Sequence, residues 1–139
     1  MTYDDDNIFA KIIRGEMPCY KVYEDEMTIA FMDVFPQTRG HTLVLPKKSG
    51  IDLLNTDPDD LAAAIRVTHK VARAVDKAVS PEGITVAQLN RAPAGQSVFH
   101  THFHIIPRWE GDEVKPHNTV PGNGDELQAL ANEIIAALD

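Results

Sequence analysis

Apolar residues recur along this chain with spacings of two and of three to four, which are typical of strands and of amphipathic helices. A short first helix is predicted where apolar residues share one helical face, at Ile8, Phe9, Ile12 and Ile13. Asp6 is placed to cap this helix, because its carboxylate accepts hydrogen bonds from free backbone N–H groups, and Gly15 is a natural end.

Alternating apolar and polar residues between the helices predict strands. The first two candidate strands flank a tight acidic turn, which indicates an antiparallel hairpin. A loop at residues 90–95 separates the last two, and its glycine and short side chains permit close backbone approach to a ligand. The strands are expected at residues 21–25, 27–33, 41–46, 84–89 and 97–106.

A long helix is predicted to begin at Asp57 and Pro58, because the carboxylate caps free N–H groups and proline loses nothing at the first helical position. Its apolar face, up to about residue 79, is expected to carry Leu61, Ile65, Thr68, Ala72, Val75 and Val79. A last helix is expected on Leu127, Leu130, Ile134 and Leu138. This order predicts an α+β domain, a mainly antiparallel sheet with a long central helix and short terminal helices.

The composition is that of one globular domain, expected to span residues 1–139 with a flexible acidic tail at residues 1–6. Thirteen basic against 21 acidic residues give a net charge of −8, which argues against a nucleic-acid partner bound through general basicity. Cys19 is the single cysteine, and no segment has the apolar length of a membrane span. We therefore expect a cytoplasmic protein with no membrane partner.

Three histidines alternate with other residues in the last candidate strand, where an extended backbone would place His100, His102 and His104 on one face. A neutral imidazole can attack phosphorus at neutral pH and leave a phosphoramidate that water cleaves, while neighbouring rings bind phosphate oxygens. Backbone N–H groups just before the strand would cradle the phosphate, and Ser97 would protonate a leaving group.

Basic residues gather in two windows that contain no Asp or Glu. The windows, residues 83–109 and 34–51, hold Arg91, Arg108, Arg39, Lys47 and Lys48. Because both windows flank strands that are expected to be adjacent, their shared surface is predicted to be positive and suited to an anion such as phosphate.

A metal centre is the competing interpretation, because HxH pairs on strands chelate zinc, iron or copper. On a flat strand, however, the outer rings of His100 and His104 lie ~13 Å apart, and their window contains no carboxylate or cysteine ligand. We therefore expect no metal and no cofactor.

The segment GQSVFHTHFHIIPR resembles the signature of the histidine triad (HIT) family of hydrolases and transferases. The likeness extends upstream through IFAKIIRGEMP and VYEDEMTIAFMDVFPQTRGHTLVLPKK and covers roughly residues 7–109. It implies a HIT-like α+β fold, a homodimer, and activity at the α-phosphate of nucleotides, usually purine ones. Residues 110–139 have no counterpart and are expected to be a variable C-terminal extension.

The resemblance also implies roles for individual residues. His102 corresponds to the nucleophile that forms a transient nucleotidyl-histidine, His104 to the contact with the α-phosphate, and His100 and His41 to a supporting polar shell. Asp33 corresponds to the ribose-binding acid. The remaining positions implied for nucleotide binding are Ile8, Phe9, Ile12 and Val34 around the nucleoside, and Asn90, Gly95, Gln96 and Ser97 in the phosphate loop.

Ala10 stands where some members carry a cysteine of a zinc site, which is a second reason to expect no structural zinc. The resemblance favours the nucleoside phosphoramidase branch, with a purine nucleotide of AMP or GMP type as substrate or product. The alternatives are a dinucleoside polyphosphate hydrolase, in which Arg91, Arg108 and Lys47 hold distal phosphates, a nucleotide sensor with little catalysis, and a metal-binding module.

Overall fold

The structure, a computed structural model, describes residues 1–112 and 120–139; part of the expected C-terminal extension, 113–119, lies outside them. Five strands form one sheet in the order β1-β2-β3-β5-β4, and all neighbours are antiparallel. The strands are β1 (Lys21–Glu24), β2 (Thr28–Met32), β3 (Thr42–Pro46), β4 (Gly83–Gln88) and β5 (Phe103–Arg108). The helices are α1 (Ile8–Ile13), α2 (Pro58–Val79) and α3 (Gly124–Ala137), with 3₁₀ turns at Leu53–Asn55 and Ala92–Ala94. The predicted α+β class is confirmed.

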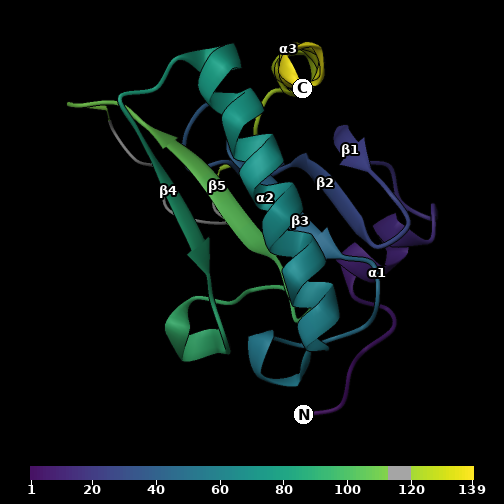
Figure 1. Ribbon diagram of the computed structural model, residues 1–139. Helices are drawn as coiled ribbons and strands as arrows, with labels where there is room; N and C mark the ends of the chain where they lie inside the picture. The colour runs from purple at the N-terminus through teal and green to yellow at the C-terminus, as the bar shows by residue number, and fades with distance from the viewer. Residues whose placement is uncertain (113–119) are drawn as a thin grey trace.

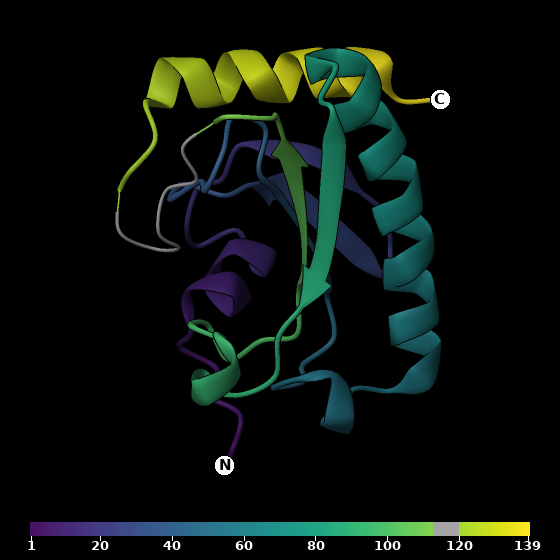
Figure 2. The same cartoon turned by 90° about the vertical axis from the view of Figure 1, so that its left-hand side faces the viewer.

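The helices lie on different sides of the sheet. Helix α2 runs along one face, while α1 lies beside the opposite face (Figures 1 and 2). Helix α3 crosses near the C-terminal end of α2 and also contacts β1 (Figure 2). One sheet face is therefore covered by α2 and α3, and the other is left to α1 and the connecting loops.

Local sequence explains where the helices begin. Asp57 caps α2 by accepting from the backbone N–H of Asp59, with Pro58 at the first helical position, as predicted. The prediction for α1 was wrong by one residue, because Asn7 rather than Asp6 accepts from Ala10 N at 2.9 Å. A neutral amide oxygen caps as well as a carboxylate, so composition alone does not separate the two positions.

The apolar core lies between the helix-covered face of the sheet and helices α2 and α3. Residues Ala30, Met32, Val44 and Ile105 supply the sheet side and are all almost fully buried. The side of α2 that packs here consists mainly of Ala64, Val67, Val71, Ala74 and Val75. The predicted apolar face was therefore partly wrong, and Ile65 is 47% exposed. Alanines take part in this contact, while Ile65 lies on the side of α2 that faces away from it.

The triad segment departs from the predicted strand at 97–106, because β5 begins only at Phe103. Thr101 N donates to Gly50 O rather than to a strand, and the His102 ring bonds the carbonyl of His100. The chain before β5 therefore follows the loop after β3 instead of the sheet. In the part of the chain that the structure describes, no helix is both long and apolar enough to cross a membrane.

Candidate active site

A pocket on the α1 side of the sheet gathers most of the residues that the sequence singled out. Strands β2, β3 and β5 form its floor, and α1 forms one wall. The predicted residues that line it are Ile8, Phe9, Asp33, Val34, Ser97, His102 and His104. Phe31, Leu43 and Val98 also line it, and these were missed because their apolar character gave no functional signal.

One end of the pocket is apolar and is built around Phe9. The Phe9 ring lies edge-on to Phe31 at 5.5 Å and edge-on to His102 at 5.0 Å between centroids. Ile8 lines the pocket and is partly exposed, while Ile12 packs against the cluster around Phe9 without lining the pocket. This end has the shape and polarity to receive a flat, largely apolar ring.

Backbone geometry sets the protonation pattern of His102. Its Nδ1 lies 2.6 Å from the backbone carbonyl oxygen of His100, so Nδ1 carries a proton and donates it. In the neutral ring, Nε2 is then the unprotonated nitrogen, which is the form that attacks an electrophile. Strand β5 begins at the next residue, Phe103.

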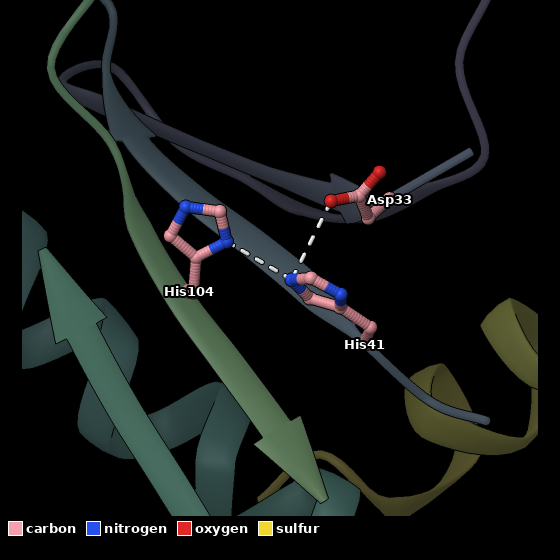
Figure 3. Close-up of side chains that lie close together, drawn as sticks. All are labelled: Asp33, His41 and His104. Carbon is pink, nitrogen blue, oxygen red and sulfur yellow. Dashed lines mark hydrogen bonds and ion pairs between the residues drawn. The ribbon is translucent and has the colours of Figure 1, made fainter. Parts of the chain in front are cut away.

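A second chain of contacts sets the tautomers of His41 and His104. The Gln37 backbone N–H donates to His41 Nδ1 at 3.0 Å, so the proton of the neutral His41 ring sits on Nε2. Nε2 lies 2.9 Å from His104 Nδ1 and 3.4 Å from Asp33 Oδ2, and Figure 3 shows both contacts. If His41 donates to His104 Nδ1, the proton of His104 is on Nε2, where it can be donated to an anion.

His100 does not share a face with the other two histidines, and that expectation was wrong. Its ring is fully buried between Tyr3 and β3, and it does not line the pocket. Nε2 donates to Pro46 O at 2.7 Å, and Nδ1 accepts from the Tyr3 hydroxyl at 2.6 Å. Burial lowers the pKa of His100, so its ring stays neutral, and its backbone carbonyl remains in place to orient His102.

Hydrogen bonds of the side-chain amides of Asn90 and Gln96 hold the loop before the triad in place. Asn90 Oδ1 accepts from Leu53 N at 2.9 Å, and Gln96 is bonded to Arg91 N and to Ile51 O. Gly95 has a φ of +105°, which an L side chain rarely adopts. Of this predicted phosphate loop, Ser97 lines the pocket, while the Asn90 and Gln96 side chains fix the loop backbone.

The basic residues of the two acid-free windows do not form one positive surface, and this expectation was wrong. Lys47 forms an ion pair at 2.6 Å with Glu24, which lies outside the acid-free window that contains Lys47. The Arg91 side chain is 72% exposed and lies 3.8 Å from Asp52. Folding thus supplies acids from other segments, and only Arg108 lies in a pocket that His104 also lines.

A possible metal-binding group exists that spacing along the strand did not predict. Ligand atoms of Asp33, His41 and His104 all lie within 4.8 Å of one another and all three residues are buried (Figure 3). Two imidazoles on tetrahedral zinc, each about 2.0–2.1 Å from the ion, hold their nitrogens about 3.3 Å apart. The 2.9 Å between His41 and His104 is shorter and matches a shared proton.

An antiparallel sheet of this order, with three histidines at and just before β5, is the arrangement of a histidine triad protein. The HIT domain model matches residues 14–111, and the chain belongs to the HIT family. A Hit-like protein from Bartonella henselae, solved with an unknown ligand, is 49% identical with a TM-score of 0.93, over 99% of this chain and 100% of that one.

Two further proteins are similar over most of this chain. A hypothetical histidine triad nucleotide-binding protein from Sulfolobus tokodaii is 36% identical with a TM-score of 0.85, over 93% of this chain and 89% of that one. Adenylylsulfatase HINT3 from Arabidopsis thaliana is 36% identical over 137 residues, which are 99% of this chain and 70% of that protein.

Proposed function

We propose that this protein is a nucleotide hydrolase that acts at the α-phosphate of purine nucleotide conjugates, of the nucleoside 5′-phosphoramidate type. The observation that carries the proposal is the His102 ring, whose unprotonated Nε2 belongs to a pocket with an apolar wall and with a second histidine, His104, that can donate a hydrogen bond to an anion. The names of two relatives support it, one a nucleotide-binding protein and one an adenylylsulfatase.

In this proposal each part of a nucleotide has a place in the pocket. The base packs against Phe9 and Ile8, which offer apolar surface, with Ile12 and Val34 beside them. Asp33 lines the pocket and accepts from the ribose hydroxyls, while its Oδ1 also accepts from Phe35 N at 2.8 Å and its Oδ2 lies 3.4 Å from His41 Nε2. The α-phosphate then lies against the Nε2 edges of His102 and His104, neighbouring rings whose centroids are 4.9 Å apart.

The reaction takes place in two displacements at phosphorus. His102 Nε2 forms a bond to the α-phosphorus, and the bond from phosphorus to the leaving group breaks, so that the leaving group takes the electron pair. Ser97 protonates an amine leaving group, and His104 Nε2–H stabilises charge on the phosphate oxygens. Water then attacks the nucleotidyl-histidine, releasing the nucleoside monophosphate and restoring His102.

The supporting residues act by holding protons and loops in place. His41 keeps His104 protonated on Nε2, while the His100 carbonyl keeps His102 protonated on Nδ1. Gly95 and Gln96 hold the loop that presents Ser97, and Asn90 ties this loop to the 3₁₀ turn after β3. None of these steps uses a metal or a cofactor.

We infer that the working unit is a homodimer in the cytoplasm. Strand β4 is an edge strand, and an edge offers unpaired backbone groups to a partner. Val86 on this strand is 49% exposed, and Ile65 on α2 is also exposed, so apolar side chains are available on both elements. Equilibrium sedimentation of the full chain tests the dimer, and a monomer at micromolar concentration would contradict it.

A dinucleoside polyphosphate hydrolase is the second candidate. Arg108 favours it, because this cation lines a pocket that also reaches His104. Neither Lys47 nor Arg91, the other cations considered for distal phosphates, lines either pocket.

The test compares kcat/KM for adenosine 5′-phosphoramidate, a diadenosine polyphosphate and a uridine phosphoramidate. The proposal predicts the highest value for the adenosine phosphoramidate and the lowest for uridine. Preference for the polyphosphate would select the second candidate. Tight AMP binding without turnover of any substrate would contradict both and indicate a sensor.

A further inference from the structure

A second pocket lies beside the first on the same sheet face, and His104 lines both. Strand β5 contributes His104, Ile106 and Arg108, which share one face because alternate residues of a strand point the same way. Thr85 and Ala87 of β4 and Gln37 are among its other lining residues. Among residues 1–112 and 120–139, none that lines this pocket is acidic, and the one permanent charge on its lining is the Arg108 guanidinium.

Hydrogen bonds turn the Arg108 side chain back along the strand toward His104. In the β4–β5 register Arg108 lies opposite Gly83, whereas Thr85 lies opposite Ile106. Arg108 Nε nevertheless donates to Thr85 Oγ1 at 3.2 Å. The guanidinium is therefore displaced by about one same-face step, ~6.6 Å, from its own backbone position toward His104.

A second contact ties Arg108 to the histidines. Arg108 Nη2 donates to Gln37 Oε1 at 3.3 Å, and the backbone N–H of the same Gln37 donates to His41 Nδ1. His41 in turn contacts His104. Gln37 thus positions both the Arg108 guanidinium and the His41–His104 pair.

The Arg108 guanidinium retains unused donor capacity. Among residues 1–112 and 120–139, the buried Nη1 finds no hydrogen-bond partner, and none of their carboxylates forms an ion pair with Arg108. An unsatisfied buried donor is costly, particularly on a charged group. Thr85 Oγ1 accepts from Arg108, so its own hydroxyl proton is available as a further donor.

We propose that this second pocket is the leaving-group subsite, and that Arg108 lets it accept anionic leaving groups such as sulfate or phosphate in addition to an amine. The inference rests on the proposed function, because it assigns the group attached to the α-phosphate to the side of His104 opposite Phe9. Such a leaving group departs with its electron pair when the bond from His102 Nε2 to phosphorus forms. Arg108 stabilises the charge that develops on it, so this leaving group needs no proton from Ser97.

The test uses two substrates that differ only in the leaving group: adenosine 5′-phosphosulfate, which releases an anion, and adenosine 5′-phosphoramidate, which releases an amine. The measured quantity is the ratio of their kcat/KM values. In Arg108→Gln this ratio is expected to fall about tenfold to hundredfold, the effect of one or two charge-assisted hydrogen bonds. Arg108→Lys keeps the charge without the contacts to Thr85 and Gln37, so it is expected to restore part of the ratio.

Arg73→Gln is the matched control, because it removes an equal charge from an exposed position on α2, outside both pockets. Its ratio is expected to stay within about twofold of wild type, the size of a surface charge effect. Equal losses on both substrates in Arg108→Gln would mean a purely structural role and would overturn the proposal. If Arg108→Gln left the kcat/KM of both substrates at the wild-type value, the proposal would be overturned as well.

A binding measurement separates this proposal from the proposed function. If the wild-type protein cleaves neither substrate, the proposed hydrolase activity fails, and the subsite is then judged by calorimetry with AMP and ADP. The subsite predicts that Arg108→Gln weakens ADP binding more than AMP binding, by about tenfold. The same factor for both ligands would overturn the subsite.

Discussion

The two faces of the sheet are built from the same strands but in opposite ways. Toward α2 and α3 the strands present apolar side chains such as Val44 and Ile105, which the helices cover completely. Toward α1 they present a smaller apolar cluster, and beside it buried polar groups such as His41 and His104. Alternation along each strand thus separates the residues that supply stability from those that carry chemistry.

The difference teaches how a small domain can bury several imidazoles. Each buried ring has a partner that accepts or donates a proton: Pro46 and Tyr3 for His100, and Gln37 and His104 for His41. A buried polar group is costly only when it lacks such a partner. The active-site face therefore has its tautomers fixed by the hydrogen bonds that also offset the cost of burial.

The largest expected effect is on the active-site face. His102→Ala is expected to reduce turnover by roughly 10³-fold or more, because the nucleophile is lost, while AMP binding remains measurable. Steady-state kinetics and calorimetry check the two parts. Turnover near the wild-type rate in a folded His102→Ala protein would contradict the assignment.

A truncation on the helix-covered face is expected to act on stability alone. Ile134 of α3 is fully buried, so Ile134→Ala is expected to lower the free energy of unfolding by about 2–5 kcal/mol. Urea denaturation measures this change. The kcat of the folded protein is expected to stay within about twofold of wild type, because a substitution in the distant core acts independently of the active site. A large loss of kcat would show that the two faces are coupled.

Tyr3 tests the contact between the N-terminal segment and the histidines. Tyr3→Phe keeps the ring but leaves Nδ1 of His100 without its donor, so it is expected to lower stability by about 1–3 kcal/mol. The Nδ1 signal in ¹⁵N spectra of the His100 ring is expected to shift, because this nitrogen loses its donor while Pro46 O still holds the ring proton on Nε2. An unchanged spectrum and unchanged stability would contradict this role.

The smallest expected effect is the pH dependence that His100 contributes. Burial holds the pKa of the folded His100 below its ordinary value near 6.5, so the unfolded chain takes up a proton at higher pH than the folded one. Stability is therefore expected to fall as the pH drops below about 6.5. Urea denaturation at several pH values measures this slope.

Two variants assign the slope to a residue. His100→Gln is expected to flatten it, since an amide can bond Pro46 and Tyr3 without titrating. His69→Gln removes an exposed imidazole of α2 and is the comparison variant. Equal slopes in wild type and His100→Gln would contradict the assignment.

The sequence predicted elements well where the signal was local. The hairpin of β1 and β2 and the start of α2 at Asp57 agree with the structure, because turn and cap chemistry depend on neighbouring residues. The side of α2 that is buried was partly wrong at Ile65, because its packing depends on the small residues that face the sheet. Local pattern cannot reveal that contact.

The site was predictable in its residue types but not in its arrangement. The alternation of His100, His102 and His104 was visible, yet His100 left the shared face because its backbone follows the loop after β3. Gln37 and Tyr3 were missed, because neither has a distinctive neighbour in the sequence, and their roles arise from contacts across 4 and 97 positions.

The central claim is that His102 Nε2 is the nucleophile, and trapping the covalent intermediate tests it most directly. The wild-type protein is mixed with adenosine 5′-phosphoramidate, quenched within milliseconds and analysed by intact and peptide mass spectrometry. The account predicts one AMP per chain, localised to His102 and missing in His102→Ala. AMP attached to another residue, or an adduct that persists in His102→Ala, would contradict the account.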